Sequence, residues 1–127
     1  MSGWGSAWAP PILIATLIFL GSSLGGGALP TSPFAGSDKL VHLVEYAALG
    51  FAICRAFTRR MAARTGTGRR GPAALLGAIA VATLYGVLDE LHQTLVPGRV
   101  FDLADLLADA VGASLGATVG WRRYQRR

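Results

Sequence analysis

Residues 85–109 have the sequence YGVLDELHQTLVPGRVFDLADLLAD, and the rest of the chain is organised around this stretch. One apolar run precedes it and another follows it. Pro97 and Gly98 fit the second and third positions of a tight turn. The stretch therefore predicts the end of one helix, a turn and the start of an antiparallel neighbour. The ionisable and amide side chains near this turn are Asp89, Glu90, His92, Gln93, Arg99, Asp102, Asp105 and Asp109.

The apolar character extends over the whole chain. Of its 127 residues, 52% are hydrophobic and 15% are charged, and the mean hydropathy is +0.45. Soluble domains carry about 25% charged residues, so this chain has too few polar side chains to cover a soluble globule. The lipid bilayer is the expected solvent and partner. We expect one membrane domain over residues 1–127, of the all-α class, folded as an integral membrane four-helix bundle.

Four segments are long and apolar enough to cross about 30 Å of hydrocarbon as helices. A Gly-, Ser- and Pro-rich loop at 21–37 and a basic connection at 55–71 separate the first three. Ser37 or Asp38 is expected to cap the second helix, and Pro72 to lie in the first turn of the third. The predicted spans are about 10–29, 38–57, 73–95 and 102–121, followed by a basic tail at 122–127.

The first span has two interpretations. Trp4 and Trp8 precede it, and tryptophans beside an apolar run are typical of the membrane interface. A cleaved signal peptide is the alternative, but the segment lacks a basic n-region and a small-residue cleavage site. We therefore expect a retained helix, which ends nearer Gly21 if the glycine run at 25–27 breaks it.

The basic residues are segregated along the chain. Four spans place ten of the twelve Lys and Arg residues on the side of the two termini and the 55–71 connection. The positive-inside rule makes that side cytoplasmic, so both termini are expected in the cytoplasm of a multi-pass protein in the cell membrane. The net charge of +5 does not indicate nucleic acid as a partner, because no basic surface interleaved with aromatic residues accompanies it.

All seven acidic residues and both histidines fall at the opposite, outer ends of the second, third and fourth spans. Charges at that location are costly in lipid and indicate a functional site. At 3.6 residues per turn, the second span carries its polar groups on one stripe. The residues of this stripe are Asp38, Lys39, His42, Glu45 and, at its edge, Tyr46.

On the third span, one face carries most of the polar groups. It holds Asp89, His92 and Gln93, whereas Glu90 turns away from Asp89.

The fourth span combines acids and glycines on one face. Its stripe begins with Asp102, Asp105 and Asp109. It continues through Gly112, Gly116 and Gly120. Glycines four residues apart let another helix approach closely. The acidic end and the close-packing surface are therefore expected to point into the bundle together.

These residues resemble the VanZ-like family of small integral membrane proteins, named for a glycopeptide (teicoplanin) resistance determinant. The resemblance rests on DKLVHLVEYAALG at 38–50, LDELHQTLVPGRVFDLADLLADAVGASLG at 88–116 and the pair Ser22-Ser23, and it covers about residues 12–120. Asp109 departs from the family, which often has Asn there. The resemblance marks Asp38, Lys39, His42, Tyr46, Glu90, Gln93, Arg99, Asp102 and Asp105 as the family's functional positions.

The polar site has several interpretations. In the structural one, Asp38 and Asp102 cap helices and Arg99 pairs with Glu90 or Asp102 to fasten the turn. In the ligand one, Arg99 and Lys39 hold a phosphate or carboxylate. A transport role would require oligomers, because nothing polar spans the cytoplasmic half. The sequence leaves the oligomeric state open.

An enzyme is the remaining interpretation. His42 with Glu45, or His92 with Glu90, would act as an acid–base pair or ligate a divalent metal with Asp105 and Asp109. However, no H-E-x-x-H, G-x-S-x-G or P-loop motif is present. The single cysteine, Cys54, allows neither an intrachain disulfide nor a thiolate metal cluster. We therefore assign no catalytic residue and expect no cofactor and no metal.

The sequence thus favours a cell-envelope protein whose outer site binds an envelope lipid headgroup, a cell-wall precursor or a glycopeptide, with an effect on glycopeptide susceptibility. A non-catalytic assembly subunit of a membrane complex and a membrane-embedded enzyme are the alternatives. The expected ligand-binding residues are Asp38, Lys39, His42, Glu45, Tyr46, Asp89, Glu90, His92, Gln93, Arg99, Asp102, Asp105 and Asp109.

Overall fold

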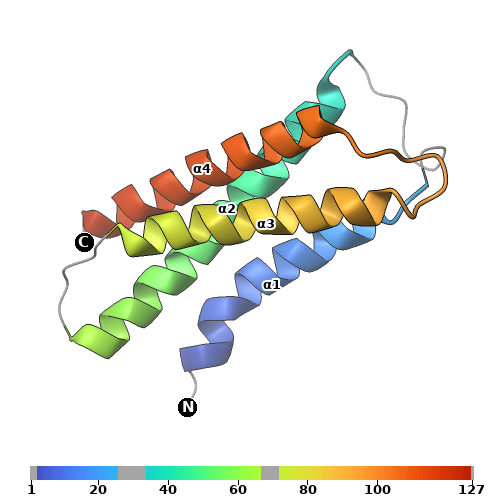
Figure 1. Cartoon of the computed structure of the whole chain (residues 1–127). Coiled ribbons are helices and arrows are strands. Elements are labelled where there is room, and N and C mark those ends of the chain that lie inside the picture. The colour runs from blue at the N-terminus through green and yellow to red at the C-terminus, as the bar shows by residue number, and fades with distance from the viewer. Residues whose placement is uncertain (1–2, 26–33, 67–71, 127) are drawn as a thin grey trace.

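Four helices make up the fold in the computed structural model, which describes residues 3–25, 34–66 and 72–126 (Figure 1). They are α1 (Gly3–Ser22), α2 (Ser37–Thr65), α3 (Ala73–Gln93) and α4 (Leu103–Gln125), and the described residues contain no strand. Each helix is long and apolar enough to cross a membrane. The all-α, four-helix membrane architecture is confirmed. The Trp4 side chain, the 26–33 part of the first loop and the basic residues at 67–71 and 127 lie outside the described residues.

The predicted start of the first span is wrong. Helix α1 begins at Gly3, and Pro10 and Pro11 lie inside it. Prolines are tolerated inside membrane helices because neighbouring groups and local adjustments satisfy the carbonyls that they leave without an N–H partner. The helix ends at Ser22, close to the earlier of the two expected ends.

The second helix is longer than predicted at its basic end. It continues to Thr65, and Gly66 ends it with φ 61° and an N–H that donates to the Ala62 carbonyl at 3.1 Å. The helix therefore includes Arg55, Arg59, Arg60 and Arg64, which do not form a loop. Arginine is a good helix former. The apolar part of α2 therefore ends where the arginines begin, whereas the helix continues through them.

The starts of α2, α3 and α4 use different caps. Gly36, with φ 84°, is the N-cap of α2, so the expectation that Ser37 or Asp38 caps this helix is wrong. Pro72 is the N-cap of α3, with helical φ and ψ, and its carbonyl accepts the Leu76 N–H at 2.9 Å, so it opens the first turn as expected. Asp102 caps α4 as the structural interpretation expected, because its Oδ1 accepts the Ala104 N–H at 2.8 Å.

The connection between α3 and α4 is a tight turn, as predicted. The Arg99 N–H donates to the Val96 carbonyl at 3.1 Å, and Gly98 has φ 78°. With Pro97 before it, this is the geometry of a type II turn, whose third position requires positive φ. Helices α3 and α4 are consequently antiparallel neighbours, and α1 begins at the end of the bundle where α4 finishes (Figure 1).

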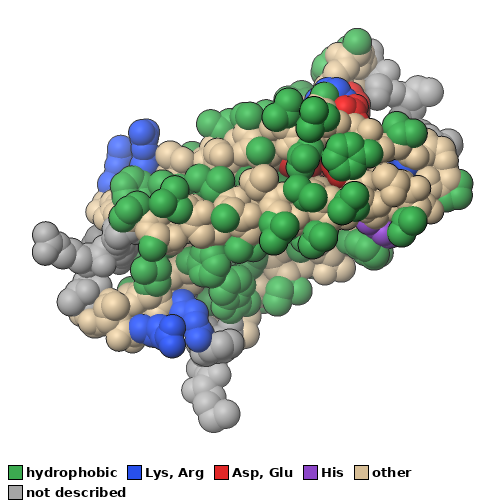
Figure 2. Space-filling model, in the orientation of Figure 1, with side chains coloured by type: hydrophobic (Ala, Val, Ile, Leu, Met, Phe, Trp, Pro, Cys, Tyr) green, Lys and Arg blue, Asp and Glu red, His purple; other side chains and the backbone are tan. Residues whose placement is uncertain are grey.

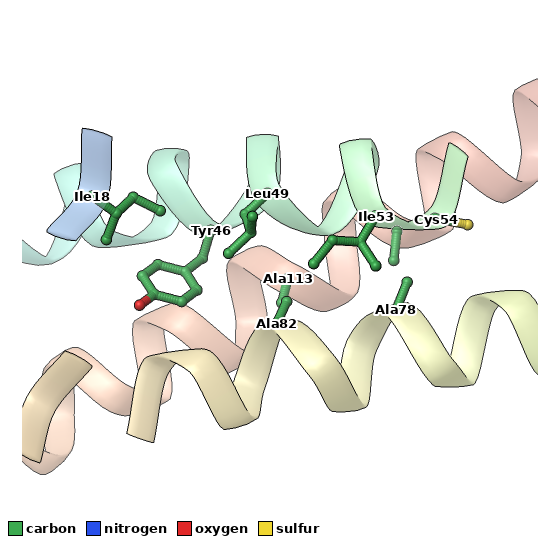
Figure 3. Packing of buried hydrophobic residues seen from close by; sticks show 9 residues of the cluster. Ile18, Tyr46, Leu49, Ile53, Cys54, Ala78, Ala82 and Ala113 are labelled. Carbon is green, nitrogen blue, oxygen red and sulfur yellow. The ribbon is translucent and has the colours of Figure 1, made fainter. Parts of the chain in front are cut away.

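The core is built from small side chains on α3 that face larger ones on α2 (Figure 3). Ala74, Ala78, Ala82 and Gly86 recur every four residues on α3, and all are buried. Glu90 is the next residue on this stripe and is fully buried as well. The polar site is therefore a continuation of the apolar core along the same helix faces.

Helices α2 and α4 pack with their backbones in contact. A Cβ atom on Gly116 would overlap the backbone carbonyl of Ala47, and one on Gly112 would overlap that of Leu43, about one helical turn earlier in α2. At Gly120 a Cβ atom would lie 3.2 Å from the Phe51 carbonyl oxygen. Only glycine permits this approach, which brings the acidic end of α4 against α2.

Large apolar side chains cover the outside of the bundle (Figure 2). Leu76, Leu84, Leu107 and Leu115 are each more than half exposed. A soluble monomer rarely presents so continuous an apolar surface. In a bilayer these side chains contact lipid, while the polar residues at the end of the core face inward.

Candidate functional site

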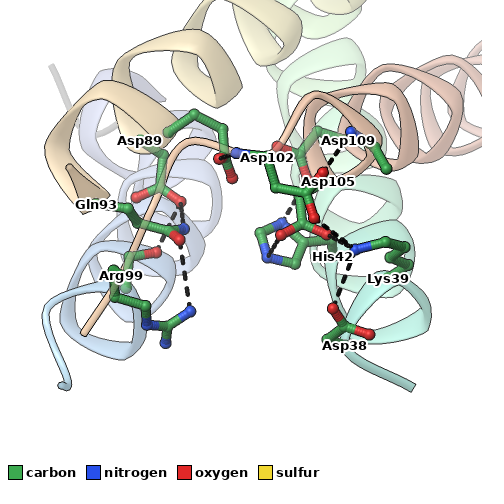
Figure 4. Close-up of polar contacts among 12 residues, drawn as sticks. Asp38, Lys39, His42, Asp89, Gln93, Arg99, Asp102, Asp105 and Asp109 are labelled. Carbon is green, nitrogen blue, oxygen red and sulfur yellow. Dashed lines mark hydrogen bonds and ion pairs between the residues drawn. The ribbon is translucent and has the colours of Figure 1, made fainter. Parts of the chain in front are cut away.

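Polar residues meet at the end of the bundle that contains the α3–α4 turn, and they divide into three groups. We call them the lysine cluster (Asp38, Lys39, Asp102, Asp105), the inner cluster (His42, Glu90, Asp109) and the serine cluster (Ser22, Ser23, Asp89, His92). Figure 4 labels all of the first group and members of the other two. Each group joins different helices and differs in how completely its hydrogen bonds are satisfied.

The lysine cluster joins α2 to the start of α4. The Lys39 ammonium donates to Asp105 Oδ1 at 2.7 Å, Asp102 Oδ2 at 2.9 Å and Asp38 Oδ2 at 3.1 Å. Its three protons are thus matched by three carboxylates. The Lys39 ammonium, and then the Ala104 N–H, hold the pKa of the exposed Asp102 carboxyl below its usual range. This group has no donor left for an anionic ligand.

The inner cluster lies deeper and takes one side chain from each of α2, α3 and α4. His42 Nδ1 and Asp109 Oδ1 are 2.9 Å apart, and His42 Nε2 is 3.7 Å from Asp105 Oδ2. Glu90 Oε2 accepts the backbone N–H of Asp102 at 2.9 Å. Glu90 and Asp109 are fully buried, and His42 is 9% exposed. The cluster is therefore held in place by its neighbours and largely shielded from solvent.

Two oxygens of the inner cluster have no partner. Glu90 Oε1 and Asp109 Oδ2 are buried and form no hydrogen bond within the described part of the chain. A buried polar atom left unpaired costs about 1–3 kcal/mol, and more when it belongs to a charged group. Gly86 makes room for this arrangement, because a Cβ atom there would lie 3.0 Å from Asp109 Oδ2.

The serine cluster joins α1 to α3. Ser22 Oγ donates to Asp89 Oδ2 at 2.7 Å in a buried hydrogen bond. Ser23 Oγ lies 3.0 Å from His92 Nε2, and the Phe19 ring lies over the same imidazole with centroids 4.6 Å apart. Asp89 Oδ1 is a further buried oxygen without a partner. The two acids of α3 thus face different neighbours, as the helical spacing predicted.

Arg99 lies beside the serine cluster. It donates from Nε to the Leu24 carbonyl at 3.3 Å and from Nη1 to Gln93 Oε1 at 3.4 Å. The structural interpretation expected Arg99 to pair with Glu90 or Asp102, and that pairing is wrong among the described residues. Both of its hydrogen bonds are long and neither partner is charged, so the guanidinium keeps its capacity to bind an anion.

A sequence model of the family described as VanZ/LLP1 matches residues 8–123 of the chain. The chain belongs to the VanZ/LLP1 family. This confirms the resemblance noted from the motifs. No curated protein and no solved structure matches the chain. Together with the four candidate spans, membership in VanZ/LLP1 makes this a multi-pass membrane protein whose three clusters all lie inside the matched range.

Two residues expected in the site of this VanZ/LLP1 protein stand apart from the clusters. Glu45 is partly exposed and forms no hydrogen bond or ion pair with the described residues. Tyr46 is fully buried with an unpartnered hydroxyl, and its ring centroid is 6.3 Å from that of Tyr85. Tyr46 therefore closes the site on the side of the apolar core.

Sequence reasoning did not assign Ser22, Ser23, Tyr85 or Gly86 to the VanZ/LLP1 site. The two serines were part of the family motif, but they follow an apolar run and were placed in a loop. Tyr85 donates its hydroxyl proton to the Ala15 carbonyl and ties α3 to α1. Gly86 could have been predicted from the sequence, because it is the fourth small residue on the α3 stripe that ends at Glu90.

Two surface depressions of this VanZ/LLP1 protein lie away from the clusters. Their volumes are about 390 and 420 Å³, they are lined by residues of α1 and α2, and both include Ser6, Ala7 and Arg59. They are at the arginine-rich end, where α1 begins. The inner cluster lines neither of them.

Proposed function

We propose that this VanZ/LLP1 protein resides in the cytoplasmic membrane with both termini in the cytoplasm, as one domain whose outer polar end binds the headgroup of an envelope lipid or lipid-linked cell-wall precursor. One observation carries the proposal. Three buried carboxylates, Asp89, Glu90 and Asp109, each keep an oxygen without a partner. Helix caps and turn fasteners need no such oxygens. A bound headgroup with hydrogen-bond donors would satisfy them.

The chemistry of the site selects among headgroups. Unpartnered carboxylate oxygens accept hydrogen bonds, so they favour hydroxyl or amino groups, such as those of a sugar or an aminosugar. Arg99 supplies one planar cation suited to a phosphate or carboxylate on the same headgroup. Lys39 already serves three carboxylates and holds Asp102 and Asp105 in position. A phosphorylated, hydroxyl-rich headgroup combines both requirements.

The proposed orientation follows from the arginines. Arg55, Arg59 and Arg64 on α2 and Arg122 and Arg123 on α4 lie at the end opposite the clusters. Cytoplasmic segments carry such an excess of basic residues. The clusters then face the outer leaflet, where cell-wall precursors are used. Binding there would change the access of a glycopeptide such as teicoplanin to its target.

The test compares wild type with Glu90→Gln in a glycopeptide-sensitive host at equal membrane levels. Ser114→Ala is the matched control, because Ser114 bonds only to its own helix, at Ala110, and is outside the clusters. We expect wild type and Ser114→Ala to shift teicoplanin susceptibility and Glu90→Gln to behave like the empty vector. Native mass spectrometry of the purified protein should retain a phosphorylated glycolipid in the first two proteins only.

Two results would contradict the proposal. One is equal susceptibility for wild type, Glu90→Gln and the empty vector together with purified protein that retains no polar lipid. The other is retention of the same lipid by Glu90→Gln. In that case a non-catalytic assembly role becomes the better explanation. A protein with that role should keep its function after Glu90→Gln or Arg99→Lys and lose it when Gly112 or Gly116 is replaced by a bulky residue.

A second candidate, a membrane-embedded acid–base or metal-dependent enzyme, is favoured by the contact between His42 and Asp109. An imidazole held by a buried carboxylate is the usual arrangement of a general base. This candidate predicts that wild type changes a retained headgroup over time, whereas His42→Ala binds it without change. A headgroup recovered intact after prolonged incubation with wild type would exclude this candidate.

A further inference from the structure

The inner cluster has the geometry of a cation site. His42, Glu90 and Asp109 each offer one nitrogen or oxygen atom, and these atoms all lie within 4.8 Å of one another. The three side chains come from three different helices, which converge at this level of the core. In Figure 4 the labelled His42 and Asp109 side chains point toward each other between α2 and α4.

The unpartnered oxygens give an independent reason to place a ligand here. Glu90 Oε1 and Asp109 Oδ2 are buried without hydrogen bonds, and both residues are 0% exposed. The other Glu90 oxygen is fixed by the Asp102 N–H at 2.9 Å. Hydrogen bonds of this kind orient a metal-binding carboxylate and leave its second oxygen for the metal.

The charge balance favours a cation. Asp38, Asp102 and Asp105 share one ammonium, that of Lys39. No Lys or Arg forms an ion pair with Glu90 or Asp109 among the described residues. Buried charges are normally paired or coordinate metals. A divalent cation between these two carboxylates would compensate both of them.

A bound ion would tighten the cluster. Zinc and manganese bind nitrogen and oxygen ligands at about 2.0–2.2 Å, so neighbouring ligand atoms lie roughly 3–3.5 Å apart. The candidate ligand atoms lie within 4.8 Å of one another, so they would move closer by up to roughly 1.5 Å, and the ion would replace the 2.9 Å contact between His42 Nδ1 and Asp109 Oδ1. One imidazole and two carboxylates form a donor set that suits Zn²⁺ and Mn²⁺ better than Ca²⁺, which prefers oxygen ligands alone.

We propose that His42, Glu90 and Asp109 bind one divalent cation of the Zn²⁺ or Mn²⁺ type at the outer end of the core. Asp105 Oδ2 lies 3.7 Å from His42 Nε2, too far for a hydrogen bond, and is not one of the proposed ligands. Three protein ligands leave at least one coordination position open. The cation would use the unpartnered Glu90 and Asp109 oxygens, and the proposed headgroup would then contact Asp89 and the open coordination position. The metal is measured without any lipid, so the result does not depend on the headgroup proposal.

The test uses full-length protein purified with a histidine-free tag, stripped with a chelator and titrated with MnCl₂ or ZnCl₂ by calorimetry. We expect about one equivalent bound by wild type, as for other protein metal sites. Glu90→Gln and Asp109→Asn should each weaken binding by at least about tenfold. Glu45→Gln is the matched control, because it removes a carboxylate on the same helix as His42 that forms no hydrogen bond or ion pair with the described residues, and it should leave the affinity unchanged.

A spectroscopic measurement covers the case in which a variant does not fold. Electron spin-echo spectra of Mn²⁺-loaded wild type should contain the signal of a directly coordinated imidazole nitrogen. The proposal is overturned if folded wild type binds neither ion, or if bound Mn²⁺ lacks a nitrogen ligand. It is also overturned if folded Glu90→Gln and Asp109→Asn bind as tightly as wild type, or if Glu45→Gln loses binding equally.

Discussion

The lysine cluster and the inner cluster lie side by side, yet they are built in opposite ways. In the lysine cluster, one partly exposed ammonium donates to three carboxylates within 3.1 Å. In the inner cluster, two fully buried carboxylates keep oxygens that nothing satisfies. The first group is complete without a ligand and the second is not. We infer that the lysine cluster fastens α2 to α4 and that the inner cluster is the site.

The largest expected effect comes from the packing on which both clusters depend. Gly116→Leu would push side-chain atoms into the Ala47 carbonyl and separate α4 from α2. We expect a loss of about 3 kcal/mol or more, at the upper end for overpacked interiors. The adjacent Leu115 is 54% exposed, so Leu115→Val should change stability by less than about 0.5 kcal/mol. Thermal unfolding in detergent measures both, and equal stability of the two variants would refute the contact.

The next effect separates the two clusters. Lys39→Met leaves Asp38, Asp102 and Asp105 without a cation, and the Asp105 side chain is only 11% exposed. We expect destabilisation of roughly 2 kcal/mol, between the values for exposed and fully buried ion pairs. The double variant Lys39→Met/Asp105→Asn should recover part of the loss. No recovery would mean that Lys39 does not compensate this buried acid.

The smallest effect concerns the exposed edge of the lysine cluster. Lys39 lowers the pKa of folded Asp102 below its ordinary value of 3.8. A lowered pKa means that the stabilisation is complete above the unfolded value and declines as the pH falls through the folded value. Asp102→Asn keeps a good N-cap. The unfolding temperatures of variant and wild type should therefore differ at about pH 6, and the difference should shrink as the pH falls progressively below 3.8. A difference that persists at low pH would contradict this assignment.

Much of the architecture was predictable because lipid imposes it. Four apolar segments, the Pro97-Gly98 turn and the gathering of acids at one end all follow from residue types and spacing. The helix ends were less predictable, because Pro10 and Arg55 mark a change of composition that does not stop a helix. Gly36 is the N-cap of α2 and has a left-handed backbone. The sequence did not predict this, because Ser37 and Asp38, which follow it, are more usual N-cap residues.

The division into clusters was not predictable from one sequence. Periodicity places Asp89 and Glu90 on different faces, but it does not say which neighbour each face meets. That depends on the rotation of α3, which is set by its packing through Ala78, Ala82 and Gly86. The same packing brings Ser22 to Asp89, although the sequence placed this serine in a loop.

The central claim is that the inner cluster is kept for binding and does not stabilise the fold. The most direct measurement is the unfolding temperature of Glu90→Gln in chelator-treated detergent solution, beside wild type and Lys39→Met. Glutamine removes the negative charge and still accepts the Asp102 N–H, so we predict an unfolding temperature equal to or above that of wild type. A decrease as large as that of Lys39→Met would contradict the claim, because it would mean that the inner cluster also stabilises the packing of the helices.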